Sequence, residues 1–161
     1  MSAIYLSTLG VKLKYAVEAT AGTRPTLSSA YTELEGVKTI PSMNPSPDTL
    51  ETTTLNETEY KTYIPGLKDL GGALSFTFNL SQDLQDKWDT LMTAYETGIA
   101  SSPAKNTWFL IEIPGITKGL YFKGQPSAMG LPELDVNSVA EIEMSITPLA
   151  APIWDTKPSA S

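Results

Sequence analysis

Hydrophobic and polar residues alternate in several stretches of the chain, and this pattern predicts β-strands. In ALSFTFNL (residues 73–80) every second side chain is apolar, which is the period of a strand with one buried face. VKLKYAV (11–17) and SVAEIEMSI (138–146) alternate in the same way, whereas TWFLIEI (107–113) is apolar on both faces. Further strands are predicted at 31–40, with an interruption near Gly36, at 58–64, and in two short pieces at 119–123 and 127–131.

One stretch has the period of an amphipathic helix, and we predict that helix over residues 81–97. Ser81 is suited to cap the amino end, Asp83 lies in the first turn where the helix dipole favours an acid, and Gly98 is placed to end the helix. The apolar side chains repeat at the spacing of one helical stripe. The predicted contacts of this helix with the core are Leu84, Trp88, Leu91, Met92 and Tyr95.

A polar segment without hydrophobic period, residues 41–57, separates two of the predicted strands. It contains three prolines, which reduce the entropy that a segment loses when it docks. Loops of this length inside a small domain are usually functional or disordered. After the following strand, Pro65 and Gly66 fit the two central positions of a type II turn. The sequence therefore predicts a long loop and then a tight turn.

About seven strands and one helix, without a strand–helix–strand rhythm, predict a mainly β protein. We expect an antiparallel β-sandwich or open barrel with one flanking α-helix. The 161 residues fit one domain, which we place at 1–147. Residues 148–161 contain three prolines and no period, and we expect a C-terminal tail that forms an arm or is disordered.

Composition removes several classes of function. The chain has no Cys and no His, so thiolate metal sites and Ser/His or Cys/His catalysis lose their usual residues. The 18 acidic side chains outnumber the 11 basic ones, which disfavours tight binding to nucleic acid. Lys12 and Lys14 interrupt the apolar amino-terminal stretch, and no window is long enough to span a membrane. We expect no cofactor and no membrane partner.

Acidic side chains occur in pairs two residues apart, and on a strand both members of a pair share one face. A glycosidase also uses two carboxylates, but on different elements at a set separation. Solvated strand faces are therefore the favoured interpretation, and we predict no catalytic site. The pairs are Glu33 with Glu35, Glu57 with Glu59, and Glu141 with Glu143.

Residues 48–98 carry a resemblance to a known family. The Thr-rich approach DTLETTTLNETEY leads into YIPGLKDLGG, then into the alternating strand ALSFTFNL, and then into the acidic amphipathic helix SQDLQDKWDTLMTAYETG. In this order and spacing the segment resembles the tail tube (major tail) proteins of long-tailed bacteriophages. The resemblance implies hexameric rings that stack into a tube, with the sheets of neighbouring copies joined into one barrel around a DNA channel.

The resemblance also implies partners and sites. The partners would be further copies of the chain, a tape measure protein, and tail terminator or baseplate proteins, in a virion tail made in the bacterial cytoplasm. The loop 41–57 would reach an adjacent ring, and the acidic pairs become candidates for the channel wall, since carboxylates repel the phosphates of passing DNA. Candidate inter-ring contacts are Pro45, Pro47, Asp48, Leu50 and Leu55.

Other interpretations stay open at this point. A tube from a contractile tail or from a phage-like secretion apparatus would have the same sequence features. A monomeric β-sandwich that binds a small ligand or carbohydrate would be compact and would have no use for the loop 41–57. An enzyme is the least favoured class, because no pair or motif in the chain matches a catalytic arrangement.

Overall fold

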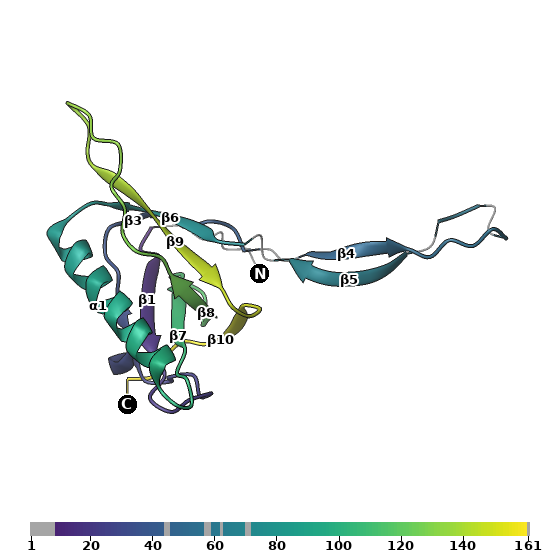
Figure 1. Ribbon diagram of the computed structural model, residues 1–161, viewed down its shortest axis with the longest axis horizontal. Coiled ribbons are helices and arrows are strands. Elements are labelled where there is room, and N and C mark those ends of the chain that lie inside the picture. Colours follow the sequence, from purple (N-terminus) through teal and green to yellow (C-terminus); the bar gives the residue numbers. More distant parts are fainter. Residues whose placement is uncertain (1–8, 44–45, 57–58, 62, 70–71, 161) are drawn as a thin grey trace, which may run out of the picture.

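The computed structural model describes residues 9–43, 46–56, 59–61, 63–69 and 72–160. In these residues the chain is mainly β, with a curled antiparallel sheet and one α-helix (Figure 1). The strand order is β2-β1-β7-β8-β9-β6-β3, and β10 pairs with β8. The elements of this sheet are β1 (Lys12–Val17), β2 (Thr32–Glu33), β3 (Val37–Thr39), β6 (Leu74–Asn79), β7 (Thr107–Glu112), β8 (Lys118–Pro126), β9 (Glu141–Pro148) and β10 (Ile153–Thr156).

The sheet forms a half-barrel, and the main core lies between its inner face and the helix α1 (Gln82–Ala100). Trp88 of α1 is fully buried and meets Phe78 of β6 edge to face, with 6.3 Å between the ring centroids. Phe109 of β7 stacks on Phe122 of β8 at 5.4 Å. The predicted mainly β fold with one flanking helix is confirmed.

A second, smaller core cluster covers the other face of the sheet. Trp108 and Leu110 of β7 point into it, next to Tyr31 and Tyr121. Phe109 and Ile111, which alternate with them, point into the main core. Both faces of β7 are buried in this way, which explains why TWFLIEI has no polar side and confirms that strand.

The helix begins as predicted and ends later than predicted. Ser81 Oγ accepts a hydrogen bond from the backbone N–H of Leu84 at 3.1 Å. The helix runs past Gly98 to Ala100, so Gly98 does not end it. A Cβ at Gly98 would lie 2.7 Å from the carbonyl oxygen of Lys105. The glycine is therefore needed for the close approach of a neighbouring segment, which a sequence pattern does not distinguish from a terminator.

The predicted strand 31–40 is divided at Gly36 into β2 and β3. Gly36 has a φ of +87°, which glycine adopts without the steric cost of a Cβ. On either side of it, Leu34 N donates to Leu13 O and Asn79 N donates to Gly36 O, both at 2.8 Å. The link between β2 and β3 is thus hydrogen-bonded to β1 on one side and to β6 on the other. β2 and β3 are the first and last strands of the sheet.

Two further predictions need correction near the carboxyl end. In place of the two short strands predicted at 119–123 and 127–131 there is one longer strand, β8, which runs from Lys118 to Pro126. Residues 127–131 form no strand. The segment after Pro148, for which we expected an arm or disorder, contains β10, which pairs with β8 from Ile153 opposite Tyr121 to Thr156 opposite Lys118.

The polar segment is also ordered differently from our prediction. β4 (Ser46–Glu51) and β5 (Tyr63–Asp69) pair with each other in a separate two-stranded ribbon. This ribbon, residues 46–69, is called the arm below, and it stands away from the half-barrel (Figure 1). The loop predicted at 41–57 thus contains a strand, and the strand predicted at 58–64 is displaced toward the carboxyl end.

Pro65 and Gly66 do not form the predicted turn, because both lie inside β5. Thr49 is paired with Pro65 and Pro47 with Lys68, so β5 has one more residue than β4 between these pairs. Such a bulge locally bends and twists a ribbon. Proline is acceptable there because both strands of a two-stranded ribbon are edge strands. The same dipeptide is thus compatible with a turn or a bulge, and the pairing partner decides between them.

Candidate assembly surfaces

Acidic side chains are the candidates for chemistry among the described residues, since the chain has no His and no Cys. No group of three or more Asp and Glu side chains among them is arranged to hold a metal ion. No helix in this part of the chain is long and apolar enough to cross a membrane. The buried Glu18 is the one acidic side chain in the described core, and its hydrogen bonds give it a structural role.

Glu18 links the turn that follows β1 to the start of β7. Its Oε1 accepts hydrogen bonds from the backbone N–H groups of Gly22 (3.1 Å) and Asn106 (2.9 Å), and its Oε2 accepts one from Trp108 Nε1 (2.9 Å). Burial alone would raise the pKa of this carboxyl, but the three donors and the nearby Lys123 outweigh burial and lower the pKa. Glu18 is therefore ionised and fully engaged, which leaves it no proton to transfer at neutral pH.

The arm exposes apolar side chains along its length. Leu55 near its far end is fully exposed, and Leu50, Tyr60 and Tyr63 are each more than half exposed. An isolated two-stranded hairpin is at best marginally stable in water. The arm therefore gains most from contact with another surface. Of the predicted inter-ring residues, Pro47 and Asp48 lie in the β4 backbone beside Leu50, whereas Pro45 lies outside the described residues.

The candidate channel residues come from three different parts of the chain. Glu33 is in β2, opposite Lys14 of β1, and Glu35 is exposed in the link that follows. Glu59 is exposed at the far end of the arm, and Glu57 lies outside the described residues. Glu141 and Glu143 are on β9, and Asn79, which pairs with Glu141, donates a hydrogen bond to the carbonyl of Gly36, next to Glu35. The structure therefore places the pair in the arm apart from the other two pairs.

Glu141 and Glu143 are part of a continuous polar surface. Their strand, β9, pairs with β6 so that Glu141 lies opposite Asn79 and Glu143 opposite Thr77. Ile142, between the two glutamates, and Phe78, between Thr77 and Asn79, point into the core. Lys38 of the neighbouring β3 forms an ion pair with Glu141. We call the outward face of β3, β6 and β9 the polar face.

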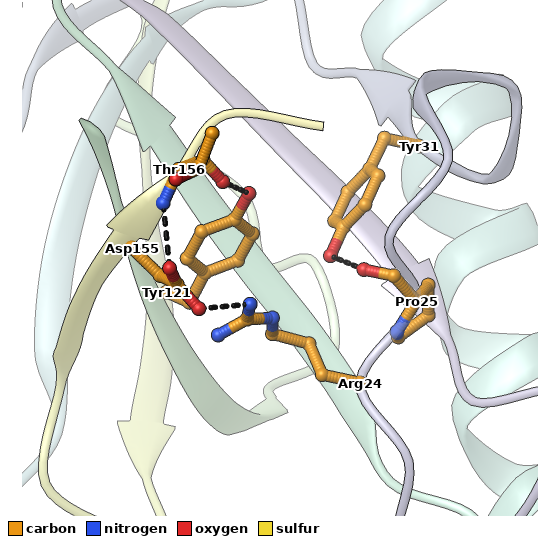
Figure 2. Close-up of polar contacts among 6 residues, drawn as sticks. All are labelled: Arg24, Pro25, Tyr31, Tyr121, Asp155 and Thr156. Atoms are coloured by element: carbon orange, nitrogen blue, oxygen red, sulfur yellow. Dashed lines mark hydrogen bonds and ion pairs between the residues drawn. The ribbon is translucent and has the colours of Figure 1, made fainter. Parts of the chain in front are cut away.

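A cluster of polar contacts holds β10 against the half-barrel (Figure 2). Arg24 Nη2 pairs with Asp155 Oδ2 at 2.5 Å, and the guanidinium lies 4.1 Å from the centre of the Tyr121 ring. Tyr121 donates its hydroxyl proton to the Thr156 carbonyl at 2.7 Å. The Arg24 hydrogen bond, with a second from the Thr156 backbone, lowers the pKa of Asp155. Burial raises the pKa values of Tyr31 and Tyr121, so both hydroxyls remain protonated donors.

One set of exposed apolar side chains was not predicted from the sequence. Residues 127–140, which we call the projecting loop, connect β8 to β9 and stand out from the sheet (Figure 1). Four apolar side chains in this loop are 60% to 87% exposed. They are Leu131, Leu134, Val136 and Val139. Leu134 and Val136 lie in residues 132–137, where the sequence has no strand or helix period, whereas Leu131 and Val139 belong to the strands predicted at 127–131 and 138–146.

Solved structures with the same fold come from tail-like particles. The chain matches a chain of the anti-feeding prophage (AFP) baseplate, solved with six-fold symmetry, with a TM-score of 0.66 and 9% identity over 97% of this chain and 98% of that one. It also matches a chain from the tail of an empty GTA particle with C6 symmetry (TM-score 0.57, 12% identity, 91% and 96% covered). A third match is a chain of the AFP tube terminating cap (TM-score 0.58, 12% identity, 97% and 95% covered).

These matches extend over nearly the whole of both chains, so they concern the complete fold, and at such low identity they show the fold alone. No family model and no curated protein matches the sequence.

Proposed function

We propose that this chain is a structural subunit of a phage or phage-like tail, which assembles with its own copies into stacked hexameric rings that form a tube. The observation that carries this proposal is the arm. The backbone of the arm is paired into a ribbon, yet the arm exposes Leu50, Leu55, Tyr60 and Tyr63 to water. A second copy in an adjacent ring would cover these side chains.

The fold supports the same proposal. The matched chains come from a baseplate, a tail and a tube terminating cap, and two of these particles are described with six-fold symmetry. In addition, β2 and β3 each have only one strand partner within the described sheet. Unpaired strand edges bind further strands readily. Edge-to-edge joining of copies would close a ring without any change in the fold.

The charge of the chain supports a conduit for DNA. Six copies with a formal charge of −7 each carry −42. In a ring whose barrel is formed by β3, β6 and β9, the polar face would line the channel, because the opposite face of these strands is packed in the core. Glu141 and Glu143 would then face the passing phosphates. Fixed negative charge at that wall repels DNA at short range, within about 8 Å at physiological salt.

A ring at one end of a tube is the second candidate function. The matched AFP chains belong to a baseplate and a cap, and a terminal ring would use the same fold. The two candidates differ in the assembly that they predict. A tube subunit forms polymers of open length, whereas an end ring stops at one or two rings.

Electron microscopy of the purified protein, combined with removal of the arm, tests this proposal. Ser46 pairs with Asp69 and Pro47 with Lys68, so replacing residues 48–67 by Asn-Gly closes the ribbon with a two-residue turn. The parent should form tubes, and the shortened variant should keep its circular dichroism spectrum but form at most single rings. A parent that remains monomeric over the accessible concentration range would contradict the proposal.

Binding to DNA gives a second test. The parent protein should shift no DNA in a gel, even at low salt, where electrostatic attraction is strongest. A basic patch that included Lys14 and Lys38 would predict the opposite. Lys14 pairs with Glu112 at 2.5 Å and Lys38 pairs with Glu141, so both cations are already neutralised. Tight, salt-sensitive binding would favour a protein that holds nucleic acid over a conduit.

A further inference from the structure

The projecting loop and a groove beside β3 are two surfaces that match in shape and chemistry. The groove lies between the start of β1 and the outer edge of β3. It has a volume of about 510 Å³, which is within the range of roughly 300–1,000 Å³ found for sites that take sizeable ligands. It is lined by Leu9, Gly10, Val11, Val37, Lys38, Thr39 and Ile40.

The wall of the groove is mostly apolar. Val11, Val37 and Ile40 pack partly against the main core and show their remaining surface to the groove. Leu9 at its rim is 83% exposed. The groove is also the margin of an unpaired strand edge, since β3 pairs with β6 alone among the described strands. Apolar side chains next to an unpaired edge are a typical site for another chain.

The projecting loop has the complementary composition. Leu134 and Val136 are 60% and 87% exposed, and they have no place in the core of their own chain. The acidic residues Glu133 and Asp135 alternate with them and are exposed as well. The exposed Lys12, which begins the strand beside the groove, supplies a positive charge there, whereas Lys38 lines the groove but is paired with Glu141 of its own chain.

The occupant of the groove should be a second copy of this chain. A closed ring requires a heterologous contact, in which one patch of each copy meets a different patch of the next. The projecting loop and the groove are two such patches, on separate parts of the fold. We propose that the projecting loop of one copy inserts into the groove of its ring neighbour, with Leu134 and Val136 covered by the apolar wall. This inference rests on the proposed self-assembly.

Disulfide cross-linking tests the contact directly, because the chain has no cysteine of its own. Two single variants are made, Val136→Cys in the projecting loop and Thr39→Cys in the groove. Both positions are surface-exposed or open to the groove, so neither change disturbs the core. The two proteins are mixed, assembled and oxidised. A covalent dimer should form in the mixture and should be absent when either variant is oxidised alone.

Controls identify the other occupants that the groove could have. Thr93→Cys, on the exposed side of α1, should give no dimer with Val136→Cys. Dimers of Val136→Cys alone would mean that two projecting loops meet each other, which overturns the proposal. Efficient linkage of Thr39→Cys to Ser2→Cys, in place of Val136→Cys, would assign the groove to the amino-terminal segment and would also overturn it.

A second variant tests the contribution of the contact. Leu134→Ser with Val136→Ser should lower the fraction of protein in rings at least tenfold in sedimentation velocity, with an unchanged melting temperature of the monomer. Tubes that form without the cross-link, and equally well in this double variant, would overturn the loop contact and leave the proposed function intact. A parent chain that does not self-associate would overturn both.

Discussion

The half-barrel buries its large apolar side chains, whereas the arm exposes them. In the half-barrel, Trp88 is fully buried, meets Phe78 edge to face, and donates its indole N–H to the Ser127 carbonyl at 2.9 Å. In the arm, Leu55 is fully exposed. Burial of apolar area stabilises a fold only where the burial occurs. The half-barrel therefore supplies the stability of the monomer, whereas the arm contributes only when a partner covers it.

The largest expected effect is the loss of Trp88. Replacing it with Ala should lower the free energy of unfolding by about 3–5 kcal/mol, through lost burial and a cavity between α1 and β6. That is a large share of the roughly 5–15 kcal/mol that holds a domain together. Thermal or urea unfolding measures the loss. Thr93→Ala, on the exposed side of the same helix, is the matched control and should unfold like the parent.

Glu18 is the next test of the half-barrel. Gln at this position should lower the free energy of unfolding by about 1.5–3 kcal/mol, because hydrogen bonds to a charged group are lost and the amide NH2, which replaces one of the two oxygens, faces a donor such as Trp108 Nε1. Urea unfolding at pH 7 measures the change. Unfolding free energies equal to those of the parent would show that the carboxylate charge is unimportant.

The pH dependence gives the same residue a second, independent readout. The pKa of the Glu18 carboxyl is lowered in the folded state from its ordinary value of 4.5 by the hydrogen bonds that it accepts. A lowered pKa means that the folded state binds the proton less tightly than the unfolded state. Its contribution is therefore present above about pH 4.5 and is lost as the pH falls through the folded-state pKa. The difference in stability between the parent and Glu18→Gln should shrink on acidification over this range.

The two regions were also unequally predictable from the sequence. In the half-barrel, the alternation of Phe76 and Phe78 with polar neighbours fixes both the strand and its buried face, because the core leaves no other register. In the arm, no core selects a register. The extra residue opposite Asp48 depends on which strand pairs with β5, and the pattern around Pro65 and Gly66 does not contain that information.

The candidate surfaces show the same limit. Acidic pairs such as Glu141 and Glu143 are visible in the sequence, but their location relative to the other pairs depends on strand order. Glu33 lies on the first strand of the order β2-β1-β7-β8-β9-β6-β3, and Glu141 lies on the fifth. The groove at Val37 depends on two strands distant in sequence, so no local pattern could predict it.

The polar face belongs to the half-barrel but should respond to substitution like a surface. Glu141→Gln with Glu143→Gln removes the ion pair to Lys38, in which both side chains are nearly half exposed. Such pairs are worth about 0–1 kcal/mol. The free energy of unfolding, measured by thermal unfolding, should therefore change by no more than this amount. A loss similar to that of Trp88→Ala would mean that the polar face is part of the folding core and has another role than lining a channel.

The smallest expected effect on monomer stability, and the largest on assembly, is at the far end of the arm. Leu55→Ser changes a fully exposed side chain, and such substitutions usually alter stability by no more than about 0.5 kcal/mol. If the arm docks on an adjacent ring, the same change removes an apolar contact from every ring junction, so losses add along the tube. Tube formation, followed by light scattering, should slow severalfold while the melting curve of the monomer is unchanged. Thr54→Ala, next to it and also exposed, should behave like the parent. Equal tube formation by Leu55→Ser and the parent would show that the end of the arm faces solvent in the assembly, and the difference between the two regions would then have no functional meaning at this residue.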